Sequence, residues 1–236
     1  TFRRFSVERI LADISNAKQQ GANFILFSDD NFTLDVKGFE SLCDAIVDAG
    51  HNDIRYIIQA SSTGIASSNT LVEKMARAGF RIVFLGIENV SEENLRLMKK
   101  GNIIEKTKLA VKRLHEHDIM IVGGMIIGNP NDKEDDIARN YEFFVDLQID
   151  FFADQILTPY PKTGMRDELL KARLVTNTHD YSRYNCFWAN IKTNYLGPED
   201  LQFLRWKYNK KYANYICTTQ KIIKNYPLAY YYRQYF

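Results

Sequence analysis

Five short apolar runs recur along the first two thirds of this chain, and each has the length of a β-strand. Most of them are rich in Ile, Val or Phe, the residues that favour strands. The runs lie at residues 22–28, 54–60, 80–87, 119–127 and 150–158. Strands that are apolar almost throughout are typical of a sheet that is covered on both faces.

Helical patterns separate these runs, with apolar residues spaced three and four positions apart. The patterns lie at residues 7–19, 35–48, 70–78, 103–116 and 134–147. Gly21, Gly50 and Gly79 stand just past three of them, where a helix C-cap is expected. Five βα units in series predict a parallel sheet, which is either open or rolled into a barrel.

Further helix starts are marked by polar residues. Ser91, followed by two glutamates, predicts a short extra helix, and Asp132 is expected to open the helix at 134–147. After Thr158 the pattern changes, and a long helix is predicted from Pro198 to about Lys224. The aromatic and basic tail at 226–236 is expected to pack across the barrel or against a further domain. Contact with a partner or a membrane surface is the alternative.

The composition excludes several classes of protein. A net charge of +2 over 236 residues gives no reason to expect a nucleic acid as partner. No apolar run is long enough for a transmembrane segment and no signal peptide opens the chain, so a cytoplasmic protein is expected. Cys43, Cys186 and Cys217 are far apart, which predicts buried or bystander thiols and no metal site of their own. The four histidines are too scattered for a hydrolytic triad.

Polar or conformationally special residues follow each of the five predicted strands. In parallel α/β folds the carboxyl ends of the strands meet at one edge, where ligands bind. The residues are Asp29, Asp30, Asn31, Ser61, Glu88, Gly128, Pro159 and Tyr160. Each also has a purely structural interpretation: a helix cap or turn for the aspartates, a salt bridge for Glu88, a turn for Ser61. Five polar ends out of five favour a binding face.

The fourth run ends on Gly124, Ile126 and Gly128, in a G-x-I-x-G pattern. Glycines inside a buried strand lose packing contacts, so their presence calls for a reason. Without side chains, the strand edge would admit a flat ligand such as adenine, and Ile126 would offer it an apolar surface. A dinucleotide-binding loop and a Walker loop are both absent from the sequence.

Four segments together resemble the radical S-adenosylmethionine superfamily, in the branch that carries an N-terminal cobalamin-binding domain. The segments are "ILFSDDNFT" at 25–33, "MARAGFRIVFLGIEN" at 75–89, "GGMIIGNPND" at 123–132 and "QILTPYPKTGM" at 155–165. The resemblance extends over residues 1 to about 200. It implies an α/β fold, a partial (β/α)6 TIM-like barrel with strands 2–6 present. The barrel would span residues 1–165, and a mostly helical C-terminal extension would span residues 166–236.

The resemblance also implies a [4Fe–4S] cluster, held by a Cys-x3-Cys-x2-Cys loop after the first strand. No cysteine here has that spacing, so the ligands are expected upstream of Thr1, in a longer chain of which this is a truncated part. The implied reaction is reductive cleavage of S-adenosylmethionine, followed by methylation, cyclisation or rearrangement of a small-molecule substrate. An external donor such as flavodoxin or ferredoxin would supply the electron. Cobalamin would bind to a domain further upstream, and the fragment alone is expected to be inactive.

The resemblance assigns cofactor-binding roles to the polar strand ends. Asp29, Asp30 and Asn31 would accept hydrogen bonds from the methionine ammonium, and Glu88 would face the methionine or the ribose. Asp132 replaces a glutamate common in the family, as a helix cap or a ligand contact. The adenine side and the remaining strand ends would be formed by Ser61, Gly124, Ile126, Gly128, Pro159 and Tyr160.

Other interpretations of the same residues stay open. The aromatic segment 181–188 would either cover a large flat or lipid-like substrate or simply pack. A Mg²⁺-dependent hydrolase or aldolase would use Asp29, Asp30, Glu88 and Asp132 as oxygen ligands. A degenerate barrel with a binding role and no catalysis is the remaining alternative.

Overall fold

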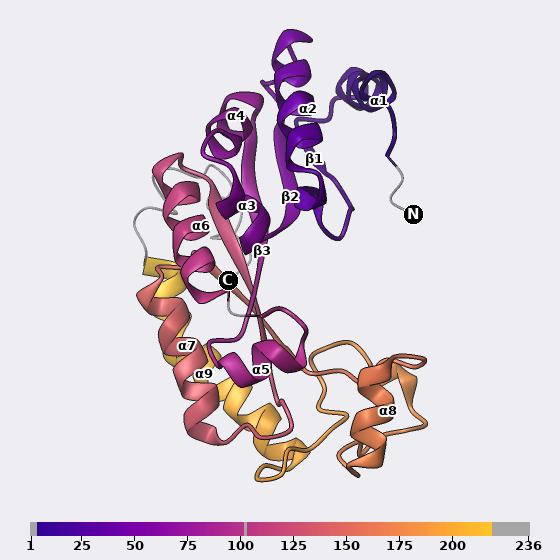
Figure 1. Ribbon diagram of the computed structural model, residues 1–236, viewed down its shortest axis with the longest axis vertical. Coiled ribbons are helices and arrows are strands. Elements are labelled where there is room, and N and C mark those ends of the chain that lie inside the picture. The colour runs from indigo at the N-terminus through magenta and orange to yellow at the C-terminus, as the bar shows by residue number, and fades with distance from the viewer. Residues whose placement is uncertain (1–3, 102, 219–236) are drawn as a thin grey trace. The chain divides into compact units, whose positions relative to one another are not determined.

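The computed structural model describes residues 4–101 and 103–218, and its central element is one five-stranded sheet. The strands are parallel, and their order in the sheet is their order in the chain, β1-β2-β3-β4-β5 (Figure 1). They are β1 (Phe24–Leu26), β2 (Arg55–Ser61), β3 (Phe80–Glu88), β4 (Met120–Ile127) and β5 (Phe151–Ile156). All five predicted strands are therefore confirmed.

Helices follow the strands as the spacing predicted. They are α1 (Val7–Gln19), α2 (Val36–Asp48), α3 (Ser62–Ser67), α4 (Leu71–Ala78), α5 (Glu92–Leu97), α6 (Ile104–Glu116), α7 (Glu134–Asp146), α8 (Gly164–Lys171) and α9 (Pro198–Thr218), with short 3-10 turns η1 (Phe32–Leu34) and η2 (Tyr181–Arg183). Gly21, Gly50 and Gly79 follow α1, α2 and α4 with φ of 89°, 67° and 99°, which confirms the predicted C-caps. Ser91 caps α5 as expected, its hydroxyl accepting from the Asn94 N–H.

The chain divides into two compact units. Unit 1 comprises Thr1–Gly86 and Ile103–Val122, and unit 2 comprises Ile87–Asn102 and Gly123–Phe236. The division predicted at residue 165, between barrel and extension, stays a prediction.

The core of unit 1 forms where α2 and α4 lie side by side against the sheet (Figure 1). Phe39 on α2 and Tyr56 and Phe80 on neighbouring strands are buried, and each of the Phe39 and Tyr56 rings lies 5.1 Å from the Phe80 ring. Along β2 buried and half-buried residues alternate, so Ser61 shares a face with Ile57 and Gln59.

In unit 2, α9 packs beside α7 and against β5 (Figure 1). Stacked rings of Tyr141 and Tyr208, 5.0 Å apart, join the two helices. Asp154 of β5 is buried among polar partners: its carboxylate accepts from the Tyr141 hydroxyl at 2.5 Å and pairs with the Arg205 guanidinium at 3.2 Å. Apolar stacking and one buried carboxylate thus hold α9 in place.

The structure departs from the expected elements in three places. The first strand begins at Phe24, because the Ala22 N–H still bonds to the Ala17 carbonyl in the turn after α1. The helix α3 was missed, because Ser61 caps a helix within residues interpreted as a turn. The predicted end of the long helix at 219–224 and the tail at 226–236 lie outside the described residues. None of the helices in the described part is both long and apolar enough to cross a membrane.

Candidate functional site

The polar residues after β1 and β2 meet in unit 1. The Asn31 side-chain oxygen accepts from the Thr33 hydroxyl at 2.8 Å, and that hydroxyl lies 3.1 Å from the Ser61 hydroxyl. Ser61 also accepts from the Gly64 N–H at 3.1 Å, at the start of α3. A Cβ on Gly64 would lie 2.1 Å from the Thr33 hydroxyl oxygen, so only glycine fits there. Asn31 and Ser61 therefore fix the loops at this edge of the sheet.

Asp29 and Asp30 lie just before Asn31 in the chain, but unlike Asn31 and Ser61 they take no part in fixing these loops. Both aspartates are exposed, and neither carboxylate has a hydrogen bond or an ion pair in the described part of the chain. A helix cap is not their role, because Asn31 caps η1 and Asp35 caps α2. The two carboxylates are therefore unpaired in the described part of the chain, and their predicted role as acceptors for the methionine ammonium stays a prediction.

Glu88, in unit 2, ends β3 in an unusual backbone conformation. Its φ of 68° lies in the left-handed region, which costs a residue with a side chain about 1–2 kcal/mol. The half-buried carboxylate pairs with the Lys100 ammonium at 3.2 Å. The salt bridge that was the structural interpretation of Glu88 is thus confirmed. The left-handed backbone is a separate feature, and such outliers gather at functional sites.

Asp132 lies at the centre of a buried amide cluster in unit 2. Only 1% of the residue is exposed. Its carboxylate accepts from the N–H groups of Gly128 and Asn129 at 2.9 Å and from the Asn94 side chain at 2.8 Å. Burial raises the pKa of this carboxyl, and the hydrogen bonds from Asn129 and Asn94 oppose the shift.

The expectation that Asp132 opens a helix is wrong. Helix α7 begins at Glu134, and the Asp136 carboxylate accepts from the Lys133 N–H at 2.9 Å in the capping position. Asp132 points the other way, because the loop after β4 presents two N–H groups to it. Asn94 was missed by the sequence analysis, since an asparagine inside a short helix carries no signal of its own.

Glycines in and after β4 have more than one cause. A Cβ on Gly123 would lie 2.8 Å from atoms of Phe144 and Ile149, so Gly123 makes room for packing. Gly128 has a φ of 84°, and a Cβ there would lie 3.2 Å from Leu201. Gly128 is therefore required by the turn. Since successive strand residues point to opposite faces, Gly124 and Ile126 lie on the face opposite Gly123. Their predicted place against the adenine stays a prediction.

The segment after β5 places Tyr160 beside a cysteine, whereas the Pro159 carbonyl accepts a hydrogen bond from Arg166 Nη1 at 2.8 Å. The Tyr160 ring is 46% exposed, and its hydroxyl lies 3.2 Å from the Cys186 sulfur. This contact with Cys186, together with burial, raises the pKa of Tyr160 to about 12. Cys43, in contrast, is fully buried in α2, as a small hydrophobe would be.

The structure thus groups the predicted residues by unit. Asp29, Asp30, Asn31 and Ser61 gather in unit 1, and Glu88, Gly124, Ile126, Gly128, Pro159 and Tyr160 belong to unit 2. Their role in binding a cofactor stays a prediction. Among the described residues, no three His, Cys, Asp or Glu side chains are placed to hold a metal ion. The cluster ligands that the resemblance implies are therefore not found among the described residues.

Comparison with known proteins identifies the family. Residues 1–144, more than half of the chain, match the Radical SAM superfamily. The chain belongs to this superfamily. An uncharacterized methyltransferase of Pyrococcus horikoshii is 27% identical over 229 residues, which cover 95% of this chain and 48% of that protein. Bacteriochlorophyllide d C-12(1)-methyltransferase of Chlorobaculum tepidum is 26% identical over 205 residues, 85% of this chain and 43% of that enzyme. The chain thus spans less than half the length of these relatives.

Solved structures confirm the fold class. The radical S-adenosylmethionine methyltransferase TsrM from Kitasatospora setae, with cobalamin and a [4Fe–4S] cluster bound, aligns with a TM-score of 0.66 at 19% identity. The alignment covers 75% of this chain and 36% of TsrM. Coproporphyrinogen III oxidase from Escherichia coli aligns with a TM-score of 0.62 at 11% identity, over 88% of this chain and 46% of that enzyme. At these identities the likeness establishes the fold alone, a partial TIM-like barrel.

Proposed function

We propose that this chain is the S-adenosylmethionine-binding barrel of a radical enzyme that methylates or cyclises an organic substrate. The match of residues 1–144 to the Radical SAM superfamily carries this proposal. Reductive cleavage of S-adenosylmethionine would use a cluster and an electron donor that the described residues do not supply.

The chain's own residues would bind and orient S-adenosylmethionine. The free carboxylates of Asp29 and Asp30 would accept hydrogen bonds from the methionine ammonium, supported by the loops that Asn31 and Ser61 fix. Glu88 would accept from the ribose or the ammonium. Gly124 and Ile126 would lie against the adenine, with Pro159 and Tyr160 on its other side. Ordered loops of this kind lower the entropic cost of holding the cofactor in one geometry.

The relatives suggest the reaction and the kind of substrate. Their names include a bacteriochlorophyllide methyltransferase, an anaerobic magnesium-protoporphyrin IX monomethyl ester cyclase and a hopanoid C-2 methylase. TsrM and OxsB are described with cobalamin bound. A large, flat organic molecule is the substrate class we propose, with cobalamin as a second cofactor.

The test is binding and cleavage of S-adenosylmethionine by the intact, iron-reconstituted protein under anaerobic conditions. We expect the double variant Asp29→Asn/Asp30→Asn to bind S-adenosylmethionine at least about tenfold more weakly, because a hydrogen bond to a charged group contributes about 1.5–3 kcal/mol. The double variant Asp48→Asn/Glu73→Gln is the control, since it removes two exposed carboxylates of helices in the same unit.

Two results would contradict different parts of the proposal. An intact protein that neither binds S-adenosylmethionine nor forms 5′-deoxyadenosine after reduction with dithionite would refute the function. A protein that does both, with unchanged affinity in the Asp29/Asp30 variant, would refute only the assignment of these residues.

A further inference from the structure

Arg166 is a buried cation without a carboxylate partner. Only 9% of the residue is exposed, and within the described part of the chain no Asp or Glu oxygen lies within ion-pair distance of its guanidinium. Its neighbour Asp167 is exposed, and Asp180, in the loop nearby, pairs with Arg183 at 3.1 Å. Buried charges in proteins are nearly always paired, so this arrangement calls for an explanation.

The position of Arg166 in its helix adds to the cost. It is the third residue of α8, where the unsatisfied N–H groups and the helix dipole present positive charge. An arginine is unfavourable there, because cations are stabilised at the other end of a helix. Burial, the dipole and the missing counter-ion act in the same direction. An anion bound beside Arg166 would offset all three.

One edge of the guanidinium is available for such an anion. Both of its hydrogen bonds use Nη1, which donates to the Pro159 carbonyl and to the Tyr184 hydroxyl at 2.8 Å each. Nε and Nη2 of Arg166 have no hydrogen-bond partner among the described groups, yet they are not among the fully enclosed side-chain atoms. In the described residues, the one fully enclosed side-chain nitrogen or oxygen without a partner is Nδ1 of His51. Together, Nε and Nη2 of Arg166 form the fork that binds a carboxylate through two hydrogen bonds.

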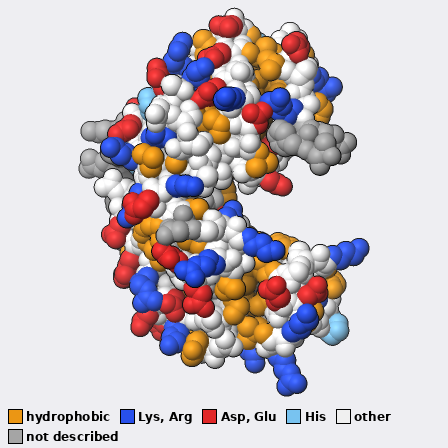
Figure 2. Space-filling model, in the orientation of Figure 1, with side chains coloured by type: hydrophobic (Ala, Val, Ile, Leu, Met, Phe, Trp, Pro, Cys, Tyr) orange, Lys and Arg blue, Asp and Glu red, His pale blue; other side chains and the backbone are white. Residues whose placement is uncertain are grey.

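Two aromatic rings lie near the guanidinium. The guanidinium carbon lies 5.6 Å from the centre of the Tyr184 ring and 5.9 Å from that of Tyr181. Tyr181 is 54% exposed and Tyr160 46% exposed, and the Tyr160 ring lies 6.4 Å from the Tyr184 ring, so both tyrosines are accessible to a ligand in this region. Figure 2 shows hydrophobic side chains gathered next to the part of unit 2 that contains α8, in the lower half of the view. A flat organic body would rest on such rings.

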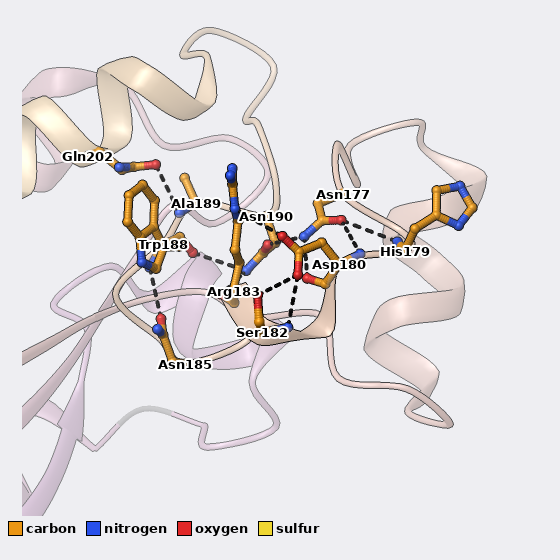
Figure 3. Close-up of polar contacts among 10 residues, drawn as sticks. All are labelled: Asn177, His179, Asp180, Ser182, Arg183, Asn185, Trp188, Ala189, Asn190 and Gln202. Atoms are coloured by element: carbon orange, nitrogen blue, oxygen red, sulfur yellow. Dashed lines mark hydrogen bonds and ion pairs between the residues drawn. The ribbon is translucent and has the colours of Figure 1, made fainter.

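Side-chain hydrogen bonds fix the segment at residues 177–190, which carries Tyr181 and Tyr184 (Figure 3). The Asn190 side chain, fully buried, donates to the Arg183 carbonyl at 2.7 Å and accepts from the Asn177 side chain at 2.7 Å. The Tyr184 hydroxyl donates to the Asn177 carbonyl at 2.5 Å, so it is fully used between Asn177 and Arg166. The rings and the guanidinium are therefore preorganised.

We propose that Arg166, with Tyr160 and Tyr181, forms a binding site for the carboxylate of a flat organic acid beside the carboxyl end of β5. As a statement about the substrate of the enzyme, this rests on the function proposed above; as an anion site, it stands on the geometry of unit 2 alone. The enzyme would recognise its substrate by an acid group attached to an aromatic or conjugated ring system.

The test compares two probes of the same shape in the intact protein, 2-naphthoate and its neutral amide, 2-naphthamide, by isothermal titration calorimetry. We expect 2-naphthoate to bind at least about tenfold more tightly, because its hydrogen bonds to the guanidinium join opposite charges and those of the neutral amide do not. Arg166→Gln should abolish this preference. Arg173→Gln, which removes an exposed arginine just past the other end of α8, should leave it unchanged.

Arg166→Lys is the second variant, because it keeps the charge and is the less disruptive change at a buried position. It should retain a preference of a few fold, since lysine has no planar fork. Equal binding of the two probes, or a preference that survives in Arg166→Gln, would overturn the proposal.

The same variants distinguish substrate from cofactor, since S-adenosylmethionine also carries a carboxylate. We expect Arg166→Gln to leave the affinity for S-adenosylmethionine within about twofold. If that affinity falls while the naphthoate preference stays, the anion is the cofactor's and the substrate assignment is wrong. Naphthoate binding needs neither cluster nor reductant, so its failure is separable from a failure to form 5′-deoxyadenosine.

Discussion

In the described part of the chain, seven residues with side chains adopt the left-handed conformation, and they fall into two groups. Lys99, Asp118, Gln148 and Arg173 stand just past the ends of helices, where this conformation closes the last turn. Glu88, Lys162 and Cys186 do not. Glu88 ends β3, and the other two lie in the segment after β5. Helix termination accounts for the first group, so the strain in the second group points to the edge where the strands end.

Glu88 allows strain and binding to be measured separately. We expect Glu88→Gly to raise the free energy of unfolding by about 1 kcal/mol, because glycine adopts a φ of 68° without steric cost. Glu88→Gln keeps the strain and should change stability by less than about 1 kcal/mol, through loss of the Lys100 ion pair. Urea denaturation measures both values.

If Glu88 contacts the cofactor, both variants should bind S-adenosylmethionine at least about tenfold more weakly, since both lack the carboxylate. A Glu88→Gly protein that is no more stable than Glu88→Gln would show that the backbone here is unstrained. Unchanged affinity in both variants would remove Glu88 from the site.

At the scale of elements, a single carboxylate joins three of them. Asp154 of β5 contacts Tyr141 of α7 and both Arg205 and Asn209 of α9. Burial raises the pKa of Asp154, and the hydrogen bond from Tyr141 and the charge of Arg205 oppose this increase. The native state therefore holds a proton on Asp154 above the pH, about 3.9, at which an unfolded chain releases it.

The raised pKa of Asp154 fixes the pH dependence of Asp154→Asn. Stability from a group with a raised pKa is present below about pH 3.9 and is lost as the pH rises through the folded-state pKa. Asparagine does not titrate, so we expect the variant to gain stability relative to the wild type as the pH rises from 4 to 7. The gain should be about 1.4 kcal/mol for each tenfold difference between the folded and unfolded acid dissociation constants of Asp154. Urea denaturation at each pH measures the difference.

Asp154→Ala provides the reference for that experiment. It removes the acceptor shared by Tyr141, Arg205 and Asn209, and should cost about 3–5 kcal/mol, as loss of one partner of a buried ion pair does. If the wild type instead becomes more stable relative to Asp154→Asn as the pH rises, the prediction is wrong. The Arg205 ion pair would then outweigh burial, and the pKa of Asp154 would be lowered.

Most elements could be predicted from the sequence, and the side-chain contacts of the site could not. The helices at 7–19 and 104–116 follow from apolar spacing, and the strands follow from their composition. The prediction that Asp132 caps a helix is wrong, although its position before an acidic helix start is typical of a cap. Its carboxylate instead accepts a hydrogen bond from the Gly128 N–H in the buried turn after β4. Arg166 gave no signal, since the absence of a counter-ion is a property of the folded chain.

At the scale of the whole molecule, the two compact units share strands. The boundaries between them fall inside β3, after Gly86, and inside β4, after Val122. Each unit therefore contains only part of these two strands, and neither has a complete sheet without the other. We infer that the units do not fold independently.

Coincident unfolding is the resulting prediction. Both tryptophans, Trp188 and Trp206, belong to unit 2, whereas the helices and strands seen by far-UV circular dichroism belong to both units. We expect one urea transition with the same midpoint for tryptophan fluorescence and circular dichroism of the 236-residue chain. Midpoints that differ by more than about 0.5 M, for curves of typical slope, would mean that the units unfold separately.

The order of the strands has a consequence for biosynthesis. Each strand from β2 onward lies next to the strand that leaves the ribosome immediately before it. The sheet can grow at one advancing border during translation, and no strand has to wait for a neighbour that is still to be made. Because each new pairing closes a loop that contains only one or two α-helices, the entropy lost at each step stays small. Each strand can thus pair with the sheet as soon as it has been synthesised.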